Sequence, residues 1–334
     1  MNQPSAETAK RGLRKLSRIP TPLIFAICIF AATLLLWWQG SLAELWRVVR
    51  EANTRKLLYA TPIYLFSLWL LAVRWHQLVK MAQGWSDLPR AAEAFLTSVV
   101  INYAAPVGLA VPSRAALTKR ALGLDHHATG VVALWEIGMD VIVLGIGTII
   151  WLILARGSTT AVANELGENA SRYEMFAIIG FVAVLILMVF FFRRAEQRRR
   201  AVNFIKRIIV SPLDRPAEAA VAFGTTVVYW ILQGVVLALL VQAMGVQTDA
   251  RFILGLTTLP MLVGMLSPIP GGAVVREAMM YVVARLANVP GAEVVAAAVM
   301  YRMALFLAIP VLYGIVRIWL ARRGDTQLPQ PESA

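Results

Sequence analysis

Charged residues are scarce in this sequence. Only 15% of its 334 residues are Asp, Glu, Lys or Arg, and its mean hydropathy is +0.67. This composition excludes an ordinary soluble domain and is typical of an integral membrane protein. The net charge of +13 does not indicate nucleic acid, because the basic residues flank apolar runs, where they orient a chain in the membrane and attract anionic lipid. We therefore expect membrane lipids, and no nucleic acid, as partners.

Cysteine and histidine are rare as well. Cys28 is the single cysteine, which excludes an intrachain disulfide. His126 and His127 are neighbours, but only Asp125 is close to them in the sequence, so we expect no metal site and no cofactor. The sequence contains no Walker loop and no HExxH or GxSxG motif. We therefore expect no catalytic residues and a protein that is not an enzyme.

Long apolar runs dominate the chain. A membrane-spanning helix needs roughly 20 apolar residues. Six segments of the sequence have this length. Two further apolar stretches each run into a Pro/Gly cluster and an arginine, and a short helical stretch follows each of them. This pattern predicts re-entrant hairpins. We expect an all-α polytopic membrane protein with eight membrane segments, namely six full spans and two re-entrant hairpins. The spans are 21–40, 58–79, 128–155, 173–192, 218–244 and 293–320, and the hairpins are 91–112 with 113–123 and 250–268 with 273–288.

The distribution of positive charge gives the orientation. In this arrangement one side of the membrane receives 21 Lys and Arg residues outside the spans and the other side receives 9. Because basic residues accumulate on the cytoplasmic side, we expect both termini to be cytoplasmic and the protein to lie in the cytoplasmic (inner) membrane. The first span has no clear cleavage site after it, so we interpret it as retained.

The sequence also contains a weak internal repeat. When PVGLAVPSR (106–114) is placed over PIPGGAVVR (268–276), a proline and an arginine coincide at a constant offset of 162 residues. Each copy reads span, span, hairpin, span, and an odd number of spans inverts the second copy relative to the first. Inverted repeats with broken helices are common in secondary transporters. We therefore divide a single membrane domain, 1–334, into halves at 20–156 and 173–321, with a tail, 322–334, that we expect to be disordered.

The second hairpin has the composition of an anion site. Pro270 stops a helix, and Gly271 and Gly272 allow a tight reversal and a close approach of backbone to a ligand. The helix that follows would direct free N–H groups at the break, with Arg276 in its first turn. Arg114 holds the matching position after the first hairpin. The alternative interpretation is a simple kink between packed helices.

Four ionisable residues fall inside predicted spans. Glu136 and Asp140 are four residues apart and share a helix face. Asp140 and Arg302 occupy equivalent positions in the two copies and should lie near the membrane midplane, so we predict that they pair, either as a structural ion pair or as a gate. Arg74 lies near the cytoplasmic end of its predicted span, and we favour the interpretation that it extends to the membrane surface over a role within the membrane.

One uncharged polar residue lies in the middle of a predicted span. Gln233 can hydrogen-bond either a ligand or a neighbouring helix, and we favour the neighbouring helix.

Three motifs resemble a known family. NYAAPVGLAVPSR (102–114), SPIPGGAVVREA (267–278) and RWHQLV (74–79) are similar to elements of the flippase-like membrane region of lysylphosphatidylglycerol synthases and their stand-alone relatives. The second motif matches the family pattern of a Pro-Gly-Gly stretch that ends in Arg-Glu, whereas the first departs from it by adding Pro112. The resemblance implies a head-group site formed by Arg114, Arg276, Glu277, Gly271, Gly272, Pro270 and Asn102.

The resemblance also implies a function. Relatives that aminoacylate lipids carry a large soluble part after the membrane region; here only a short polar stretch follows the last predicted span, so aminoacylation is not implied. We expect translocation of an anionic phospholipid or lipid-linked intermediate through a central cavity, by a protein that can also form a homo-oligomer. Three alternatives stay open: a non-transporting membrane partner of a synthesis enzyme, a lipid-modifying transferase and a transporter of small solutes.

Overall fold

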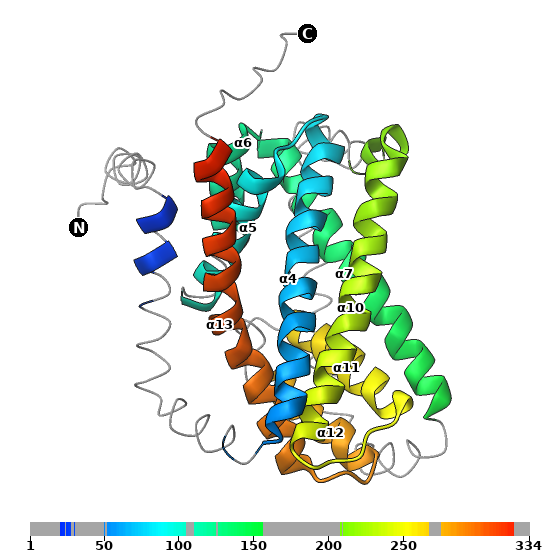
Figure 1. The fold of residues 1–334 in the computed structure, drawn as a ribbon. Coiled ribbons are helices and arrows are strands. Elements are labelled where there is room, and N and C mark those ends of the chain that lie inside the picture. Colours follow the sequence, from blue (N-terminus) through cyan, green and yellow to red (C-terminus); the bar gives the residue numbers. More distant parts are fainter. Residues whose placement is uncertain are drawn as a thin grey trace, which may run out of the picture.

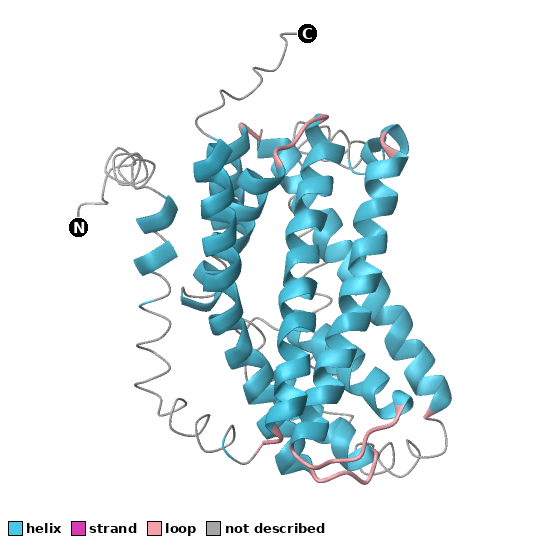
Figure 2. Cartoon of the chain, viewed as in Figure 1, coloured by secondary structure: helices cyan, strands magenta, loops and turns pink. Residues whose placement is uncertain are grey.

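The computed structural model describes residues 52–104, 110–124, 126–155, 210–266 and 275–323, together with a few positions among 21–30 and residues 50 and 208. Every element of this described part is an α-helix, and the helices stand side by side as a bundle (Figures 1 and 2). The helices are α4 (Thr54–Gln83), α5 (Leu88–Ala104), α6 (Ala110–Leu122), α7 (His126–Leu154), α10 (Pro216–Ala243), α11 (Ala250–Leu266), α12 (Val275–Leu286) and α13 (Gly291–Arg323).

Four of these helices are long and apolar enough to cross a membrane. Within the described residues they are α4, the segment 128–154 of α7, α10 and α13. They agree with four of the six predicted spans. Of the other two, 173–192 lies outside the described residues and 21–40 contributes only a few positions to them.

Two pairs of shorter helices lie where the hairpins were predicted. α5 and α6 form one pair, and α11 and α12 form the other. α6 begins at Ala110, so Pro112 lies in its first turn. Proline is tolerated there because the first N–H groups of a helix have no intrahelical partner. Pro112 therefore belongs to the start of α6 rather than to the break before it.

The centre of the bundle is an antiparallel pair, α4 and α10. At one end of the pair Lys80 Nζ lies 3.2 Å from Glu218 Oε1. At the other end Lys56 Nζ donates to Gln242 Oε1 at 3.1 Å. α7 and α13 lie on opposite sides of this pair (Figure 1).

Each helix pair packs against a spanning helix of the other half. α5 contacts α13, where the Tyr313 hydroxyl donates to Glu93 Oε1 at 3.2 Å. α11 contacts α7, where the indole of Trp151 lies so close to Gly255 that a β-carbon there would overlap it. Figure 1 shows α5 and α6 near the end of the bundle where α4 ends, and α11 and α12 near the opposite end.

Several of these contacts recur between positions that differ by 162. Asp87 and Asp249 are one such pair, and each accepts a hydrogen bond from the backbone N–H three residues later, at the start of α5 and of α11. The Lys80–Glu218 and Lys56–Gln242 contacts form a second set, and Tyr313–Glu93 and Trp151–Gly255 a third. These pairs of positions extend the offset first seen at the prolines and arginines of the two breaks.

The outer faces of the bundle are apolar. Large hydrophobic side chains on the outward faces of α7, α10 and α13 are exposed, whereas the faces of these helices that point into the bundle are buried. Exposing such apolar faces to water would cost free energy, whereas contact with membrane hydrocarbon would not. Exposed examples are Ile137, Ile149 and Ile153 on α7, Ile231 on α10, and Leu307, Ile315 and Ile318 on α13.

Candidate functional site

The first half of the chain contains a cluster of four charged residues, which we call the first cluster: Arg74, Glu136 and Asp140, which are buried, and Arg114, which is partly buried. Arg74 Nη1 lies 2.6 Å from Asp140 Oδ1, and its Nη2 lies 3.2 Å from Glu136 Oε1. Arg114 pairs with the other oxygen of Glu136. Two guanidinium groups thus face two carboxylates, and the formal charges balance.

Neighbouring polar and aromatic side chains hold the first cluster in place. Arg114 Nε donates to Ser98 Oγ at 2.8 Å, and its guanidinium lies over the rings of Trp75 and Phe95 at 5.2 and 4.9 Å. Trp230 Nε1 donates to Asp140 Oδ1 at 2.8 Å. Paired charges with further hydrogen bonds are the form in which ionised groups persist in a low-dielectric interior.

The second half contains a different cluster, Arg276, Glu277 and Arg302, which we call the second cluster. Glu277 Oε1 lies 3.5 Å from Arg276 Nη2 and 3.3 Å from Arg302 Nη1. The Arg276 guanidinium also lies 5.4 Å from the centre of the Tyr301 ring. Two guanidinium groups share one carboxylate, which leaves these three side chains with a surplus of one positive charge.

The contacts of the second cluster are also looser. Neither ion pair has hydrogen-bond geometry at the carboxylate, and both oxygens of Glu277 lack a hydrogen-bond partner among the described residues. Glu277 and Arg276 are nevertheless buried, at 8% and 7% exposure. A buried acceptor without a hydrogen bond costs free energy, so this cluster can gain from a ligand that supplies donors and negative charge.

The predicted pair between Asp140 and Arg302 is wrong. Asp140 binds Arg74 and Trp230, whereas Arg302 binds Glu277. The physical reason lies in the packing, because α4 and α10 occupy the centre and separate α7 from α13 (Figure 1). Equivalent helices do meet at the centre, but they are α4 and α10 rather than the two that carry this pair.

Arg74 does not extend to the membrane surface. Its side chain is 3% exposed and joins the first cluster. α4 continues to Gln83, four residues past the predicted end of the span, so Arg74 lies nine residues, or about 14 Å, inside the helix. The favoured interpretation, in which Arg74 extends to the membrane surface, is therefore wrong.

Gln233 forms the predicted hydrogen bonds between helices. Its Nε2 donates to Ser67 Oγ at 2.7 Å, and the Tyr301 hydroxyl donates to its Oε1 at 2.5 Å. This chain of bonds links α4, α10 and α13 in the middle of the bundle. The sequence analysis missed Trp230, which contacts the first cluster, and Tyr301, which contacts the second. Trp230 lies one helical turn before Gln233, and Tyr301 directly precedes Arg302, so both are close to residues that were selected.

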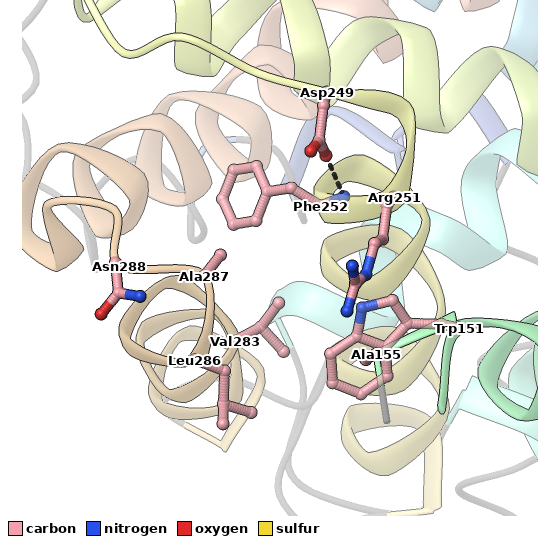
Figure 3. Close-up of a pocket in the computed structure, with 9 residues that line it drawn as sticks. All are labelled: Trp151, Ala155, Asp249, Arg251, Phe252, Val283, Leu286, Ala287 and Asn288. Carbon is pink, nitrogen blue, oxygen red and sulfur yellow. Dashed lines mark hydrogen bonds between the residues drawn. The ribbon is translucent and has the colours of Figure 1, made fainter. Parts of the chain in front are cut away.

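Two apolar grooves and one small polar pocket open on the described surface. A groove of about 690 Å³ lies between α7, α10 and α11, and one of about 340 Å³ lies between α4, α10 and α13. The polar pocket, of about 150 Å³, lies where α7 ends and α11 begins (Figure 3). In that pocket Asp249 accepts from the backbone N–H of Phe252, so its carboxylate is used to start α11.

A comparison with family models decides the family. Residues 23–314 match the model of the lysylphosphatidylglycerol synthase TM region. The chain belongs to this family. Membership, together with the spanning helices, indicates a multi-pass membrane protein and suggests a function connected with membrane lipids. Comparison with curated proteins and with solved structures gave no match.

Some residues of the family motifs fall outside the described part of the chain. Pro270, Gly271 and Gly272 are among them, and Asn102 belongs to α5 but its side chain is not described. Arg114, Arg276 and Glu277 are described, and the two arginines lie in the first turns of α6 and α12, or next to them. Arg114 therefore belongs to the first cluster of this family member, and Arg276 and Glu277 belong to the second.

Proposed function

We propose that this lysylphosphatidylglycerol synthase family protein moves an anionic lipid, or a lipid-linked intermediate, across the cytoplasmic membrane. The second cluster carries this proposal, because the buried Arg276 and the partly buried Arg302 share one carboxylate there. A phosphate group would balance the surplus charge and accept the fork of donors that a guanidinium presents. The neutral first cluster would support the bundle rather than hold the head group.

The arrangement of the helices supports an alternating mechanism. We propose that the two helix pairs are re-entrant hairpins of an inverted repeat, on opposite sides of the membrane. Contacts that recur at an offset of 162 and the antiparallel course of α4 and α10 favour this arrangement. In transporters with such repeats, the binding site lies near the centre and opens to each side in turn.

The orientation follows from the basic residues. Residues 80–90, 215–218 and 317–323 share one end of the bundle, as the Lys80–Glu218, Arg215–Gly84 and Arg323–Asp87 contacts show. We propose that this end is cytoplasmic, together with both termini. Labelling of Lys119→Cys and Gln247→Cys in a Cys28→Ser background tests this, because both side chains are exposed and α6, which carries Lys119, ends beside Gln83. Labelling of both positions from the same side would contradict the inverted arrangement.

Reconstitution tests the function itself. The purified chain is placed in liposomes with a fluorescent phosphatidylglycerol, and the fraction of probe in each leaflet is followed by quenching from outside. We expect the probe to equilibrate between leaflets without chemical change. A new lipid product would instead indicate a transferase, and neither movement nor product would indicate a partner of another enzyme.

A further inference from the structure

The larger groove is shaped by two membrane-spanning helices. One wall is α10, from Phe223 to Ala238, the other is α7, from Val143 to Ile150, and α11 forms the floor. Its volume is about 690 Å³, and its lining is mainly apolar. Ligand pockets of this size are common in proteins, but this one lies on a surface that would face lipid.

The length and position of the groove are unusual for a site that holds a lipid in one leaflet. Its α10 wall runs over sixteen residues, from Phe223 to Ala238, which is a rise of about 22 Å along the helix. Half of the hydrocarbon core measures about 15 Å. Since α10 runs from Pro216 to Ala243, this wall extends by similar distances on both sides of the middle of the helix. The groove therefore crosses the midplane of a membrane that α10 spans.

The rim of the groove is continuous with the lipid-facing surface. Ile146, Ile150, Ile231 and Val235 line it and are exposed by 40 to 61% of their surface. Within a membrane, only lipid hydrocarbon can contact these apolar side chains without a cost in free energy. A lipid acyl chain is therefore the occupant that the surroundings of the groove supply.

The groove also adjoins both charge clusters. Trp230 lines it, and the N–H of the same indole donates to Asp140 of the first cluster. On the floor, Thr258 lines the groove, and Met261, less than one turn further along α11, accepts a long contact of 3.8 Å from Arg276 Nη1. Tryptophan suits such a boundary because its ring is apolar and its N–H is polar.

We propose that the groove between α7, α10 and α11 holds an acyl chain of the transported lipid and guides it across the midplane. The lipid head group remains near the second cluster, beyond Met261 at the floor of the groove, while its chain stays in the groove. This inference rests on the proposed lipid movement for the crossing step, but occupation of the groove can be measured separately.

Photochemical labelling measures the occupation. The full chain in detergent receives an approximately equimolar phosphatidylglycerol that carries a diazirine in the middle of one acyl chain, and labelled peptides are mapped after irradiation. We expect labels at 143–150 and 223–238 in preference to the exposed face of α13.

Val227→Phe fills the groove and should lower this labelling on the order of tenfold, the factor that corresponds to lost burial of about two methylene groups. Val228→Phe is the control, because Val228 lies on the same helix, is 44% exposed and does not line the groove.

The liposome assay with the same variants completes the test. Slower lipid movement in Val227→Phe, with no change in Val228→Phe, supports the inference. Labels spread evenly over all exposed faces, or unchanged in Val227→Phe, would overturn it even if the wild-type protein moves lipid. Labels in the groove of a protein that moves no lipid would support the acyl-chain site, and would overturn both the guided crossing and the proposed function.

Discussion

Arg114 and Arg276 occupy matched positions at the beginning of α6 and of α12, but their surroundings differ. Arg114 enters a cluster in which charges balance: it pairs with Glu136, and Arg74 Nη1 lies 2.6 Å from Asp140 Oδ1. Arg276 shares Glu277 with Arg302 at 3.5 and 3.3 Å. Matched positions can therefore acquire different surroundings. Arg114 is neutralised in a cluster that joins packed helices, whereas Arg276 belongs to a cluster with one surplus positive charge, where we propose that a ligand binds.

The largest effect should come from breaking the first cluster. Arg74→Ala leaves Asp140 without a cation and Glu136 with Arg114 alone, so we expect a loss of about 3–5 kcal/mol in stability. Thermal unfolding in detergent, followed by the monodisperse fraction, measures it. Arg251→Ala removes an exposed arginine and should have little effect. Equal behaviour of the two variants would show that the first cluster does not support the fold.

The second cluster should respond in transport rather than in stability. Arg276→Ala leaves Glu277 paired with Arg302, so the charges balance and the thermal midpoint should change little. We expect lipid movement to fall on the order of tenfold to a hundredfold, the range for a lost hydrogen bond to a charged group. Arg276→Lys should recover part of it, because lysine keeps the charge and loses the fork.

Arg285→Ala is the matched control on the same helix, since Arg285 is exposed. Transport at the wild-type rate in Arg276→Ala would remove the head-group site from the second cluster.

Removing one carboxylate from each cluster should change a different property in each case. Glu277→Gln increases the positive surplus of the second cluster, and we expect binding of phosphatidylglycerol to tighten on the order of tenfold. Glu136→Gln unbalances the first cluster, and we expect lower stability without tighter binding. Binding by tryptophan fluorescence and unfolding by heat are measured on both variants. Parallel changes in the two would mean that the clusters do not differ in role.

The smallest effect should come from the polar link between the halves. Gln233→Leu removes the bonds to Ser67 and Tyr301, and we expect about 1–3 kcal/mol of lost stability, since buried partners are left behind. Ser67→Ala combined with Gln233→Leu should recover some of it. The recovery is read from a double-mutant cycle, and purely additive losses would contradict the link.

The course of the chain could be predicted much better than the partners of its side chains. Hydropathy and Pro/Gly breaks located α4, α7, α10 and α13, as well as both short helix pairs, because these patterns report the local backbone and its surroundings. The partner of Asp140 depended on which helices meet at the centre, and no pattern within α7 or α13 carries that information. Arg74 was ambiguous for a related reason, since its depth depends on where α4 ends, and Gly84 with its positive φ of 93° ends the helix beyond the apolar run.

The crossed packing of the helix pairs has a consequence for biogenesis. α5 is covered by α13, the last described helix to be synthesised, and Glu93 on α5 receives Tyr313 and Arg317 from it. Chains are made from the N-terminus, so the first half enters the membrane before the helix that completes it exists. Assembly of the first half must therefore wait for the synthesis of α13, and a chain truncated before α13 would present an uncovered α5 to quality-control proteases.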